Sequence, residues 1–345
     1  MSEELDKAVE DAVTQRLVEP DPEIDTWMPS GCTTLDLAIS DKLCGGFPIG
    51  AVSEVSGPPS TSKSVLAHAI SGACQRAGGI AFYDDVENTY KADWARLYGI
   101  DTTNIDTFRL STGEDCPRTV EDFFDKQLAE IIKLKDDRPK IVIVDTLSAF
   151  SDAVEIKDGL DAATYGAVKA KMMSKGFRKY SPSVLAKANV GLVFINQIRD
   201  NVGGYGAAHV TSGGWAVHFY SSVRVELYKI AEIEREIQGN KIPIGVELGF
   251  KVIKNKVGPP FRTGQYRILF DYGLDNIYAN LKFLKKFQPG DAKQPVEFNG
   301  EAKQMRFMVA SVEKNNQEAL LDEAVEKMWR EVYKPSGRKP REWNA

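Results

Sequence analysis

A short polar stretch, GPPSTSKS at residues 57–64, has the residue types of a phosphate-binding loop. It follows an apolar strand pattern at residues 51–55 and precedes the amphipathic helical pattern VLAHAI. In such loops, backbone N–H groups face the phosphates, a lysine ammonium reaches the β and γ oxygens, and a hydroxyl coordinates Mg²⁺. The pattern GxxxxGK[ST] is met except at Ser62, where glycine is usual, and an ordinary serine-rich turn is the alternative. The predicted nucleotide-binding residues are Gly57, Pro58, Pro59, Ser60, Thr61, Ser62, Lys63 and Ser64.

A carboxylate lies at the end of a second apolar run. Residues 140–144 read KIVIV, a β-branched pattern typical of a central parallel strand buried on both faces, and Asp145 follows directly. A carboxylate at the tip of such a strand is suited to holding Mg²⁺ or its bound water. The simpler interpretation is an aspartate that caps the next turn. Together with the loop, the pattern predicts a metal site formed by Ser64 and Asp145.

Between these segments, GGIAFYDDVENTY at residues 78–90 forms a third strand pattern that ends in acidic residues. A carboxylate just beyond such a strand can orient or deprotonate the water that attacks a γ-phosphate. Asp84, Asp85 and Glu87 all satisfy this spacing. The chemistry alone therefore leaves the choice among them open.

Positive charge is concentrated in one helical pattern, although the formal net charge of the chain is −5. The basic residues of this segment are Lys169, Lys171, Lys175, Arg178 and Lys179. On a helix, the last four recur at i, i+4, i+7 and i+8 and share one face. Such a face attracts the phosphates of a nucleic acid, or is merely solvated.

Composition limits the class of protein. The chain has 345 residues, of which 43% are hydrophobic and 27% charged, enough for one large core with small additions. The cysteines lack CxxC spacing and are expected to be free thiols, and the three histidines are too scattered for a metal centre. Neither a signal-like segment nor a run of 18 apolar residues is present, so we expect a cytosolic protein without a membrane segment.

Alternating strand and helix patterns over residues 30–271 indicate an α/β fold with a doubly wound, mostly parallel sheet. Late antiparallel strands are expected in VELGFKVIKNK and QYRILFDYG. Residues 1–29 contain an amphipathic helix pattern, whose apolar stripe needs a partner surface, and a proline-rich hinge. Residues 272–345 are expected to form a small C-terminal domain with helical patterns and a basic tail.

Several of these segments resemble, in order and spacing, the RecA-type recombinases, the family of bacterial RecA and its phage relatives. Besides the phosphate loop, the likeness includes FINQIR, GGWAVHFYSSVR and KNK, which a shared ATPase fold alone does not produce. It extends over residues 30–271 and is weak outside them. The resemblance implies a RecA-like P-loop ATPase core that uses ATP and Mg²⁺, with an N-terminal helix that docks on the adjacent subunit or on its own core.

The resemblance also assigns roles to single residues. Glu87 matches the catalytic glutamate, with one extra residue in the preceding DDV segment, and Trp94 matches the aromatic that stacks on adenine or is an ordinary buried helix residue. Gln197 matches the glutamine that senses the γ-phosphate and signals to the adjacent DNA-binding loop, with a strand-end cap as the alternative. Lys254 and Lys256 match two lysines that reach the ATP of the neighbouring subunit, and strand alternation places both on one face.

DNA contacts are implied in the same way. Lys171 and Arg178 match positions that contact the backbone of single-stranded DNA. Residues 155–164 and 199–214 resemble the two DNA-binding loops, of which the second is rich in glycine and is expected to order on binding. In the second loop, the predicted DNA-binding residues are Arg199, Val202, Tyr205, His209, Gly213 and Gly214.

The resemblance predicts an ATP-dependent recombinase that forms a helical filament on single-stranded DNA, hydrolyses ATP at subunit interfaces and pairs the strand with homologous duplex DNA. It further implies single-strand-binding and mediator proteins as partners, in the bacterial cytosol, and it allows a phage origin. Three other functions stay open. They are a hexameric helicase with the same ATPase fold, a nucleotide-binding recombination mediator with weak catalysis, and a small-molecule kinase, for which no lid or acceptor site stands out.

Overall fold

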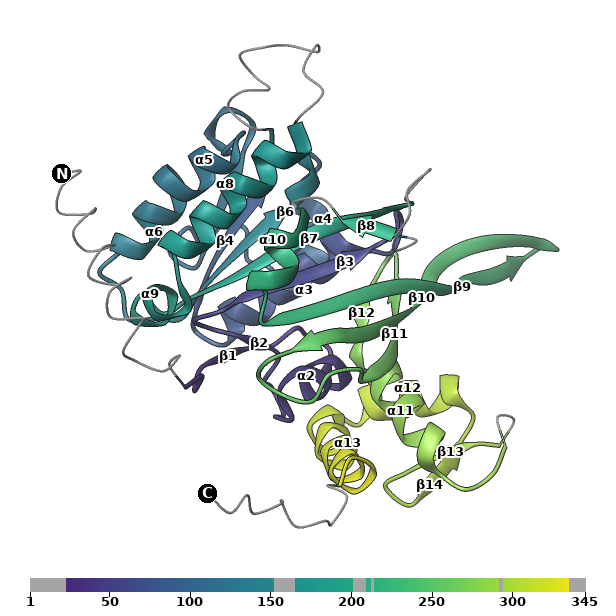
Figure 1. Cartoon of the computed structure of the whole chain (residues 1–345). Helices are drawn as coiled ribbons and strands as arrows, with labels where there is room; N and C mark the ends of the chain where they lie inside the picture. Colours follow the sequence, from purple (N-terminus) through teal and green to yellow (C-terminus); the bar gives the residue numbers. More distant parts are fainter. Residues whose placement is uncertain (1–22, 152–164, 201–208, 212–213, 292–293, 335–345) are drawn as a thin grey trace, which may run out of the picture.

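A computed structural model of the chain describes residues 23–151, 165–200, 209–211, 214–291 and 294–334. The expected N-terminal helix and the expected first DNA-binding loop lie outside these residues. Figure 1 shows a central sheet flanked by helices and a long two-stranded ribbon that projects to one side. The strand order is β12-β11-β10-β9-β3-β7-β6-β4-β5, and β8 pairs with β7.

The centre of the sheet is parallel and one side of it is antiparallel. The parallel strands are β3 (Val52–Gly57), β4 (Ile80–Asp85), β5 (Phe108–Thr112), β6 (Lys140–Asp145), β7 (Val190–Asp200) and β9 (Val223–Ile237). The antiparallel additions are β8 (His209–Thr211), β10 (Asn240–Asn255), β11 (Thr263–Leu269) and β12 (Gly273–Asp275). Two small sheets pair β1 (Trp27–Met28) with β2 (Phe47–Pro48) and β13 (Val296–Phe298) with β14 (Glu301–Lys303). The predicted mostly parallel α/β fold with late antiparallel strands is confirmed.

Helices connect most of these strands. In the first half of the chain they are α2 (Thr33–Ser40), α3 (Lys63–Arg76), α4 (Ala92–Leu97), α5 (Val120–Asp122), the π-helical turn η2 (Phe123–Leu128), α6 (Ala129–Lys133) and the 3₁₀ turns η1 (Gly113–Asp115) and η3 (Leu147–Ala149). The later helices are α8 (Tyr165–Lys179), α9 (Pro182–Lys187), α10 (Gly214–Tyr220), α11 (Asn276–Phe287), α12 (Met305–Lys314) and α13 (Glu318–Val332). Within the described part of the chain, every helix is too short or too polar to span a membrane.

Two hydrophobic clusters cover the two faces of the sheet. In β6, Ile141 and Ile143 belong to the cluster that includes α2 and α3, whereas Val142 and Val144 belong to the cluster that includes α8 and η2. Successive strand residues point to opposite faces, so the unbroken run KIVIV reflects burial on both sides. The strand pattern therefore predicted β6 correctly.

Helix α3 is more buried than its expected amphipathic pattern implies. Almost every residue from Val65 to Cys74 is buried. The sheet covers one side of the helix, and at Gly72 a Cβ atom would lie only 2.7 Å from the carbonyl oxygen of Tyr98. The close approach of the chain after α4 thus explains the burial of the side of α3 that faces away from the sheet.

The C-terminal helices pack on the core through α2. The indole N–H of Trp329 donates to Asp41 at 2.9 Å, and the guanidinium of Arg262 pairs with the same carboxylate at 2.7 Å. Trp329 is itself only 1% exposed and joins the main hydrophobic cluster. The helical pattern predicted for residues 318–333 corresponds to α13. All four cysteines are free thiols, as predicted.

Candidate nucleotide and DNA-binding site

The predicted nucleotide residues meet at the carboxyl ends of the parallel strands. In the register of the sheet, Asp85 on β4 lies beside Asp145 on β6, and Gly57 on β3 lies beside Gln197 on β7. Parallel strands all end at the same edge, so residues far apart in sequence converge there. A Cβ atom at Gly57 would lie 2.7 Å from the carbonyl oxygen of Leu227, which makes glycine necessary where β3 passes β9.

The loop before α3 is closed by its own lysine. Lys63 Nζ donates to the carbonyl oxygens of Gly57 at 3.0 Å and Pro58 at 2.7 Å. Burial lowers the pKa of Lys63, and the nearby Asp145 and Glu87 carboxylates oppose that shift. The ammonium group is thus held at the mouth of the loop beside two carboxylates, where a phosphate would replace the two carbonyl partners.

Ser62 adopts the conformation that explains why glycine is usual at this position. Its φ is 54° and its ψ is 35°, which is the left-handed region. Only the N–H and Cα of this residue are needed to turn the chain into α3, so a serine can occupy the position at the cost of some backbone strain. The departure from the motif therefore leaves the loop geometry intact.

The two predicted metal-binding residues fit Mg²⁺. Asp145 is 3% exposed, and among the described residues its Oδ1 atom has no hydrogen-bond partner. Burial raises the pKa of Asp145, while the hydroxyls of Tyr83 and Ser64 lower it. Mg²⁺ uses few protein ligands and takes the others from phosphates and water, so one free carboxylate oxygen beside a hydroxyl is sufficient. The described residues contain no cluster of three or more His, Cys, Asp or Glu suited to a metal.

Two of the three candidate carboxylates are occupied by structural hydrogen bonds. Asp85 accepts from the backbone N–H groups of Thr89 at 3.0 Å and Tyr90 at 2.9 Å, and so fixes the turn after β4. Asp84 is fully buried on the opposite face and accepts a short hydrogen bond from Gln127. Burial raises the pKa of Asp84 to about 7. Asp85 is thus engaged in the turn. Asp84 is excluded by its burial on the opposite face, although its Oδ2 atom has no partner among the described residues.

Glu87 is exposed and lies between two other strand ends. Its Oε1 atom accepts from Thr146 Oγ1 at 2.7 Å and from Gln197 Nε2 at 3.1 Å. Thr146 directly follows the metal-site aspartate, and Gln197 lies in β7. The structure thus brings the predicted catalytic glutamate and the predicted γ-phosphate sensor into direct contact, and the extra residue in the DDV segment does not prevent it.

Trp94 does not fit the interpretation of an ordinary buried aromatic. It lies on the short helix α4 and is 51% exposed. An exposed indole retains a free face for stacking on a base. Its role with adenine stays a prediction, which a substitution can test.

We expect Trp94→Ala to weaken ATP binding by about 3- to 10-fold, because an aromatic stacking contact contributes about 0.5–1.5 kcal/mol. Leu97→Ala is the matched control, since Leu97 lies on the same helix and is 43% exposed. The measurement is equilibrium titration with a fluorescent ATP analogue. Equal affinities for Trp94→Ala, Leu97→Ala and the parent protein would remove Trp94 from the site.

Lys254 and Lys256 are close in space, but not through strand alternation. The register of β10 against β9 shifts between Val252 and Lys254, and β10 ends at Asn255, so Lys256 lies beyond the strand. Lys254 Nζ donates to the carbonyl oxygens of His218 at 2.5 Å and Phe219 at 2.9 Å. The expected alternation within one strand therefore does not cover Lys256, because the strand ends at Asn255.

Positive side chains gather around Lys254. The pKa of Lys254 is lowered to about 8, first by burial and then by the positive charges of Lys256 and Arg224. Glu54 opposes the shift but already pairs with Arg224. An anion supplied from outside the subunit would relieve the repulsion between the two lysines.

A buried polar chain that the sequence reasoning missed connects this region with β7. Glu54 on β3 is completely buried and accepts from Asn196 Nδ2 at 2.8 Å and from Arg224 Nε at 2.5 Å. The Arg224 guanidinium also lies 3.0 Å from His218 Nε2. A glutamate inside the apolar run AVSEV was the available signal, because a buried charge needs a partner. The residue before Gln197 is thus linked to the strand pair that carries Lys254.

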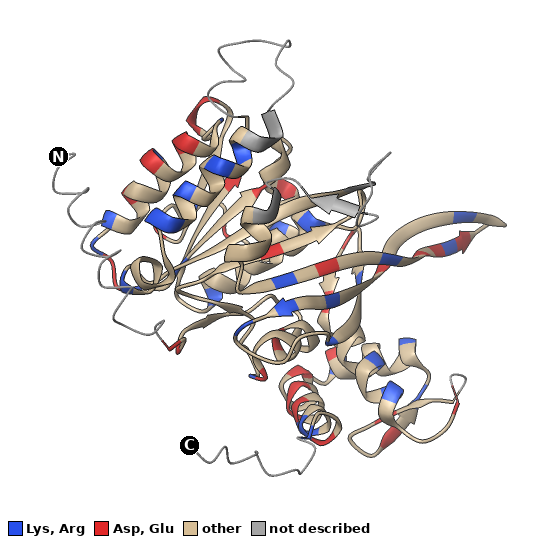
Figure 2. Cartoon of the chain, in the orientation of Figure 1, with Lys and Arg blue, Asp and Glu red and all other residues tan. Residues whose placement is uncertain are grey.

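The predicted DNA-binding helix α8 is amphipathic. Lys171, Lys175 and Arg178 are exposed, whereas Met173 and Phe177 are buried against the sheet. Figure 2 shows basic positions recurring along this helix.

The face differs from the expectation at its ends. Lys179, expected to share the basic face, pairs with Asp125 of η2 at 2.8 Å, and Lys169 donates to the carbonyl oxygen of Phe150 at 2.6 Å. The charge open to solvent is therefore concentrated at Lys171, Lys175 and Arg178.

The second expected DNA-binding loop is narrower than residues 199–214. Arg199 is part of β7, His209 begins β8 and pairs with Asp200, and Gly214 begins α10. Val202, Tyr205 and Gly213 lie outside the described residues. Strand β7, which carries Gln197, thus continues directly into the hairpin that holds the loop.

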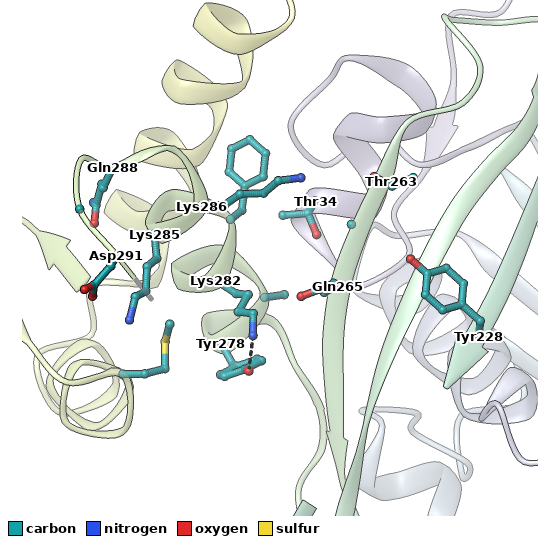
Figure 3. A pocket seen from close by; sticks show the side chains of 15 residues that line it. Thr34, Tyr228, Thr263, Gln265, Tyr278, Lys282, Lys285, Lys286, Gln288 and Asp291 are labelled. Atoms are coloured by element: carbon teal, nitrogen blue, oxygen red, sulfur yellow. Dashed lines mark hydrogen bonds between the residues drawn. The ribbon is translucent and has the colours of Figure 1, made fainter. Parts of the chain in front are cut away.

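A separate hollow lies between α11, β11 and β9, away from the phosphate loop. Its volume is about 560 Å³, and Figure 3 shows Lys282, Lys285 and Lys286 projecting from α11 with Tyr228 across from them. Lys282 already pairs with Glu247 at 3.1 Å. None of the residues that the sequence singled out lines this hollow.

Comparison with known proteins agrees with this geometry. The RecA N-terminal domain family matches residues 3–275, and the match therefore begins well before residue 30. The protein named Protein RecA from Nautilia profundicola is 34% identical over 273 residues, which cover 79% of this chain and 73% of that protein. Protein RecA from Helicobacter pylori is also 34% identical, with the same coverage of both chains. Protein RecA from Campylobacter jejuni subsp. doylei is 33% identical over 78% of this chain and 74% of its own.

Proposed function

The chain belongs to the RecA family, and from this premise we propose that it is an ATP-dependent recombinase. It assembles into a filament on single-stranded DNA in the cytoplasm and exchanges that strand with a homologous duplex. The observation that carries the proposal is the contact between Glu87 and Gln197. It joins a carboxylate that acts on the loop lysine Lys63 with the strand that leads into the second DNA-binding loop.

The residues of the loop bind and orient the triphosphate. Backbone N–H groups between Gly57 and Ser64 face the phosphates, and Lys63 exchanges its two carbonyl partners for β- and γ-phosphate oxygens. Ser64 and Asp145 would hold Mg²⁺, which neutralises phosphate charge when it is bound. Glu87 then orients the attacking water and accepts its proton.

DNA reaches the same site through β7. A change in the β7–β8 hairpin on binding DNA moves Gln197, and Gln197 donates directly to the Glu87 carboxylate. With DNA bound and ATP present, the amide turns to the γ-phosphate and releases Glu87 for the water. This is a two-position device, in which one side chain has a different partner in each state.

We propose that a neighbouring subunit completes the site. Lys254 and Lys256 carry mutually repelling charges. Lys254 lies in the last residues of β10, at the end of the strand away from the projecting tip, and Lys256 follows just after the strand. The γ-phosphate of an adjacent subunit is an anion of the required kind. In the transition state its charge would be stabilised by lysines that arrive only when the interface closes.

Mixing two inactive variants tests this arrangement. Lys63→Ala lacks its own phosphate lysine, and Lys254→Ala/Lys256→Ala lacks the donated pair. Each alone should have almost no ATPase activity on single-stranded DNA. A mixed filament should recover a clear fraction of the parent rate, because some interfaces combine an intact loop with intact donated lysines.

The mixed filaments must first be demonstrated by imaging two differently labelled variants on the same DNA. If they form and no activity returns, the lysines act within their own subunit or serve only the fold. The test uses steady-state phosphate release. As a control, the parent protein is mixed with either variant. This shows how far the ATPase rate falls when inactive subunits are inserted among active ones.

Electron microscopy and a strand-exchange assay distinguish the proposed recombinase from the alternatives. With ATP and single-stranded DNA, helical filaments and exchange with homologous duplex are expected. Closed rings with unwinding activity would indicate a helicase. Nucleotide binding without ATP hydrolysis would indicate a mediator. ATP turnover at the same rate with and without DNA would fit a small-molecule kinase. Single-strand-binding and mediator proteins remain proposed partners, to be tested by their effect on filament formation.

A further inference from the structure

The metal-site carboxylate is held by a hydroxyl that the loop does not supply. Tyr83 Oη donates to Asp145 Oδ2 at 2.5 Å, and Tyr83 is 1% exposed. Strands β4 and β6 are parallel neighbours in which Tyr83 lies beside Ile143 and Asp85 beside Asp145. The Tyr83 side chain therefore extends along β6 from the level of Ile143 to the level of Asp145, where its hydroxyl meets the carboxylate.

An aromatic cluster fixes the phenol in this position. The ring of Tyr83 stacks on His68 of α3, with 5.0 Å between centroids and 24° between planes. Tyr90 and Phe108 lie 5.7 and 6.5 Å from it. Burial lowers the pKa of His68 to about 4, although the Asp85 carboxylate opposes the shift, so the stacked imidazole is neutral near pH 7. Contacts with these three rings fix the Tyr83 ring, and with it the position of its hydroxyl.

The consequence is an asymmetric carboxylate. Its Oδ2 atom is occupied by the phenol, and its Oδ1 atom has no partner within the described residues. The Ser64 hydroxyl interacts with the same carboxylate. A buried carboxylate oxygen without a donor requires a cation or a water, and only Oδ1 is available for either.

We infer that Tyr83 is a positioning residue for Mg²⁺, which acts by fixing the Asp145 carboxylate with Oδ1 directed to the ion. This inference rests on the proposed nucleotide site. Without the hydroxyl, Asp145 can rotate and Oδ2 is left buried without a donor. Groups of this kind, behind a metal ligand, typically change metal affinity by about 10- to 100-fold when they are removed.

The test uses Tyr83→Phe, which removes one oxygen and keeps the stacked ring. The matched control is Tyr90→Phe, because the Tyr90 hydroxyl belongs to the same cluster and has no hydrogen-bond partner within the described residues. Binding of a fluorescent ADP is titrated with Mg²⁺ and repeated in EDTA. We expect Tyr83→Phe to raise the half-saturating Mg²⁺ concentration about 10-fold while the affinity in EDTA is unchanged. Tyr90→Phe should change neither value.

A double-mutant cycle with Asp145→Asn shows whether Tyr83 acts through Asp145. The variant Tyr83→Phe/Asp145→Asn should have the same Mg²⁺ dependence as Asp145→Asn alone. It also lacks the unpaired buried carboxylate, so it is expected to fold even if Tyr83→Phe does not. A further loss of Mg²⁺ affinity in the double variant would overturn the inference.

The outcomes separate this inference from the proposed function. If the parent protein binds no nucleotide in the presence of Mg²⁺, the proposed function fails. If it binds nucleotide and Tyr83→Phe leaves the Mg²⁺ dependence unchanged, only the role of Tyr83 fails. Equal weakening in Mg²⁺ and in EDTA would mean that Tyr83 supports the loop as a whole, which also contradicts the inference.

Discussion

Lys63→Ala is expected to reduce ATP hydrolysis by about 10²-fold or more while the protein stays folded. The ammonium is the charge aimed at the β and γ phosphates, and losing one preorganised electrostatic contact of this kind typically has an effect of this size. In the structure, the lysine is buried and donates to two loop carbonyls. Its removal also removes a charge that burial disfavours, so the thermal midpoint should change little.

The measurement is steady-state phosphate release on single-stranded DNA, with circular dichroism to verify the fold. Lys126→Ala is the matched control, because that lysine is exposed and pairs with Asp122 far from the loop motif. Normal hydrolysis by a folded Lys63→Ala protein would show that residues 57–64 are not the phosphate loop.

Glu87→Gln should bind ATP and assemble on DNA but hydrolyse ATP about 10²-fold or more slowly. The amide keeps the size of the side chain and an oxygen that accepts from Thr146, and it loses the basicity that takes a proton from water. Affinity for ATP and filament formation provide the internal control. Single-turnover hydrolysis with preassembled filaments isolates the chemical step.

Asp84→Asn and Asp85→Asn are the matched comparisons. Asp85 holds the turn after β4 by accepting hydrogen bonds from two backbone N–H groups. Asp85→Asn should therefore lower the thermal midpoint, while the folded protein keeps most of its turnover. Asp84→Asn should retain most activity, since Asp84 lies on the opposite face and contacts Gln127. If either aspartate variant is inactive and Glu87→Gln is active, the catalytic carboxylate has been misassigned.

The parts of the fold with strong local patterns could be predicted from the sequence. KIVIV gave a strand buried on both faces, and residues 318–333 gave a helix, because burial and periodicity are properties of the local sequence. The motif predicted a phosphate loop in spite of Ser62, and in the structure this serine adopts the left-handed conformation that glycine usually provides.

The missed features depend on contacts between distant segments. The register shift of β10 before Lys254 and the end of this strand at Asn255 are set by pairing with β9. The Glu54 and Tyr83 contacts join different strands, and nothing in the spacing of either residue specifies its partner. Spacing left Asp84, Asp85 and Glu87 equivalent, and the resemblance singled out Glu87. Only the fold shows which partners hold Asp84 and Asp85.

The central claim is that DNA switches on hydrolysis through Gln197 and Glu87, and it is tested most directly by the ATPase rate of the parent protein with and without single-stranded DNA. The rate should rise strongly on adding single-stranded DNA, and in Gln197→Ala, which should still bind ATP, the rate should no longer respond to DNA, because the side chain that contacts Glu87 is missing. A parent rate that is the same with and without DNA, at saturating ATP and on verified filaments, would contradict the claim.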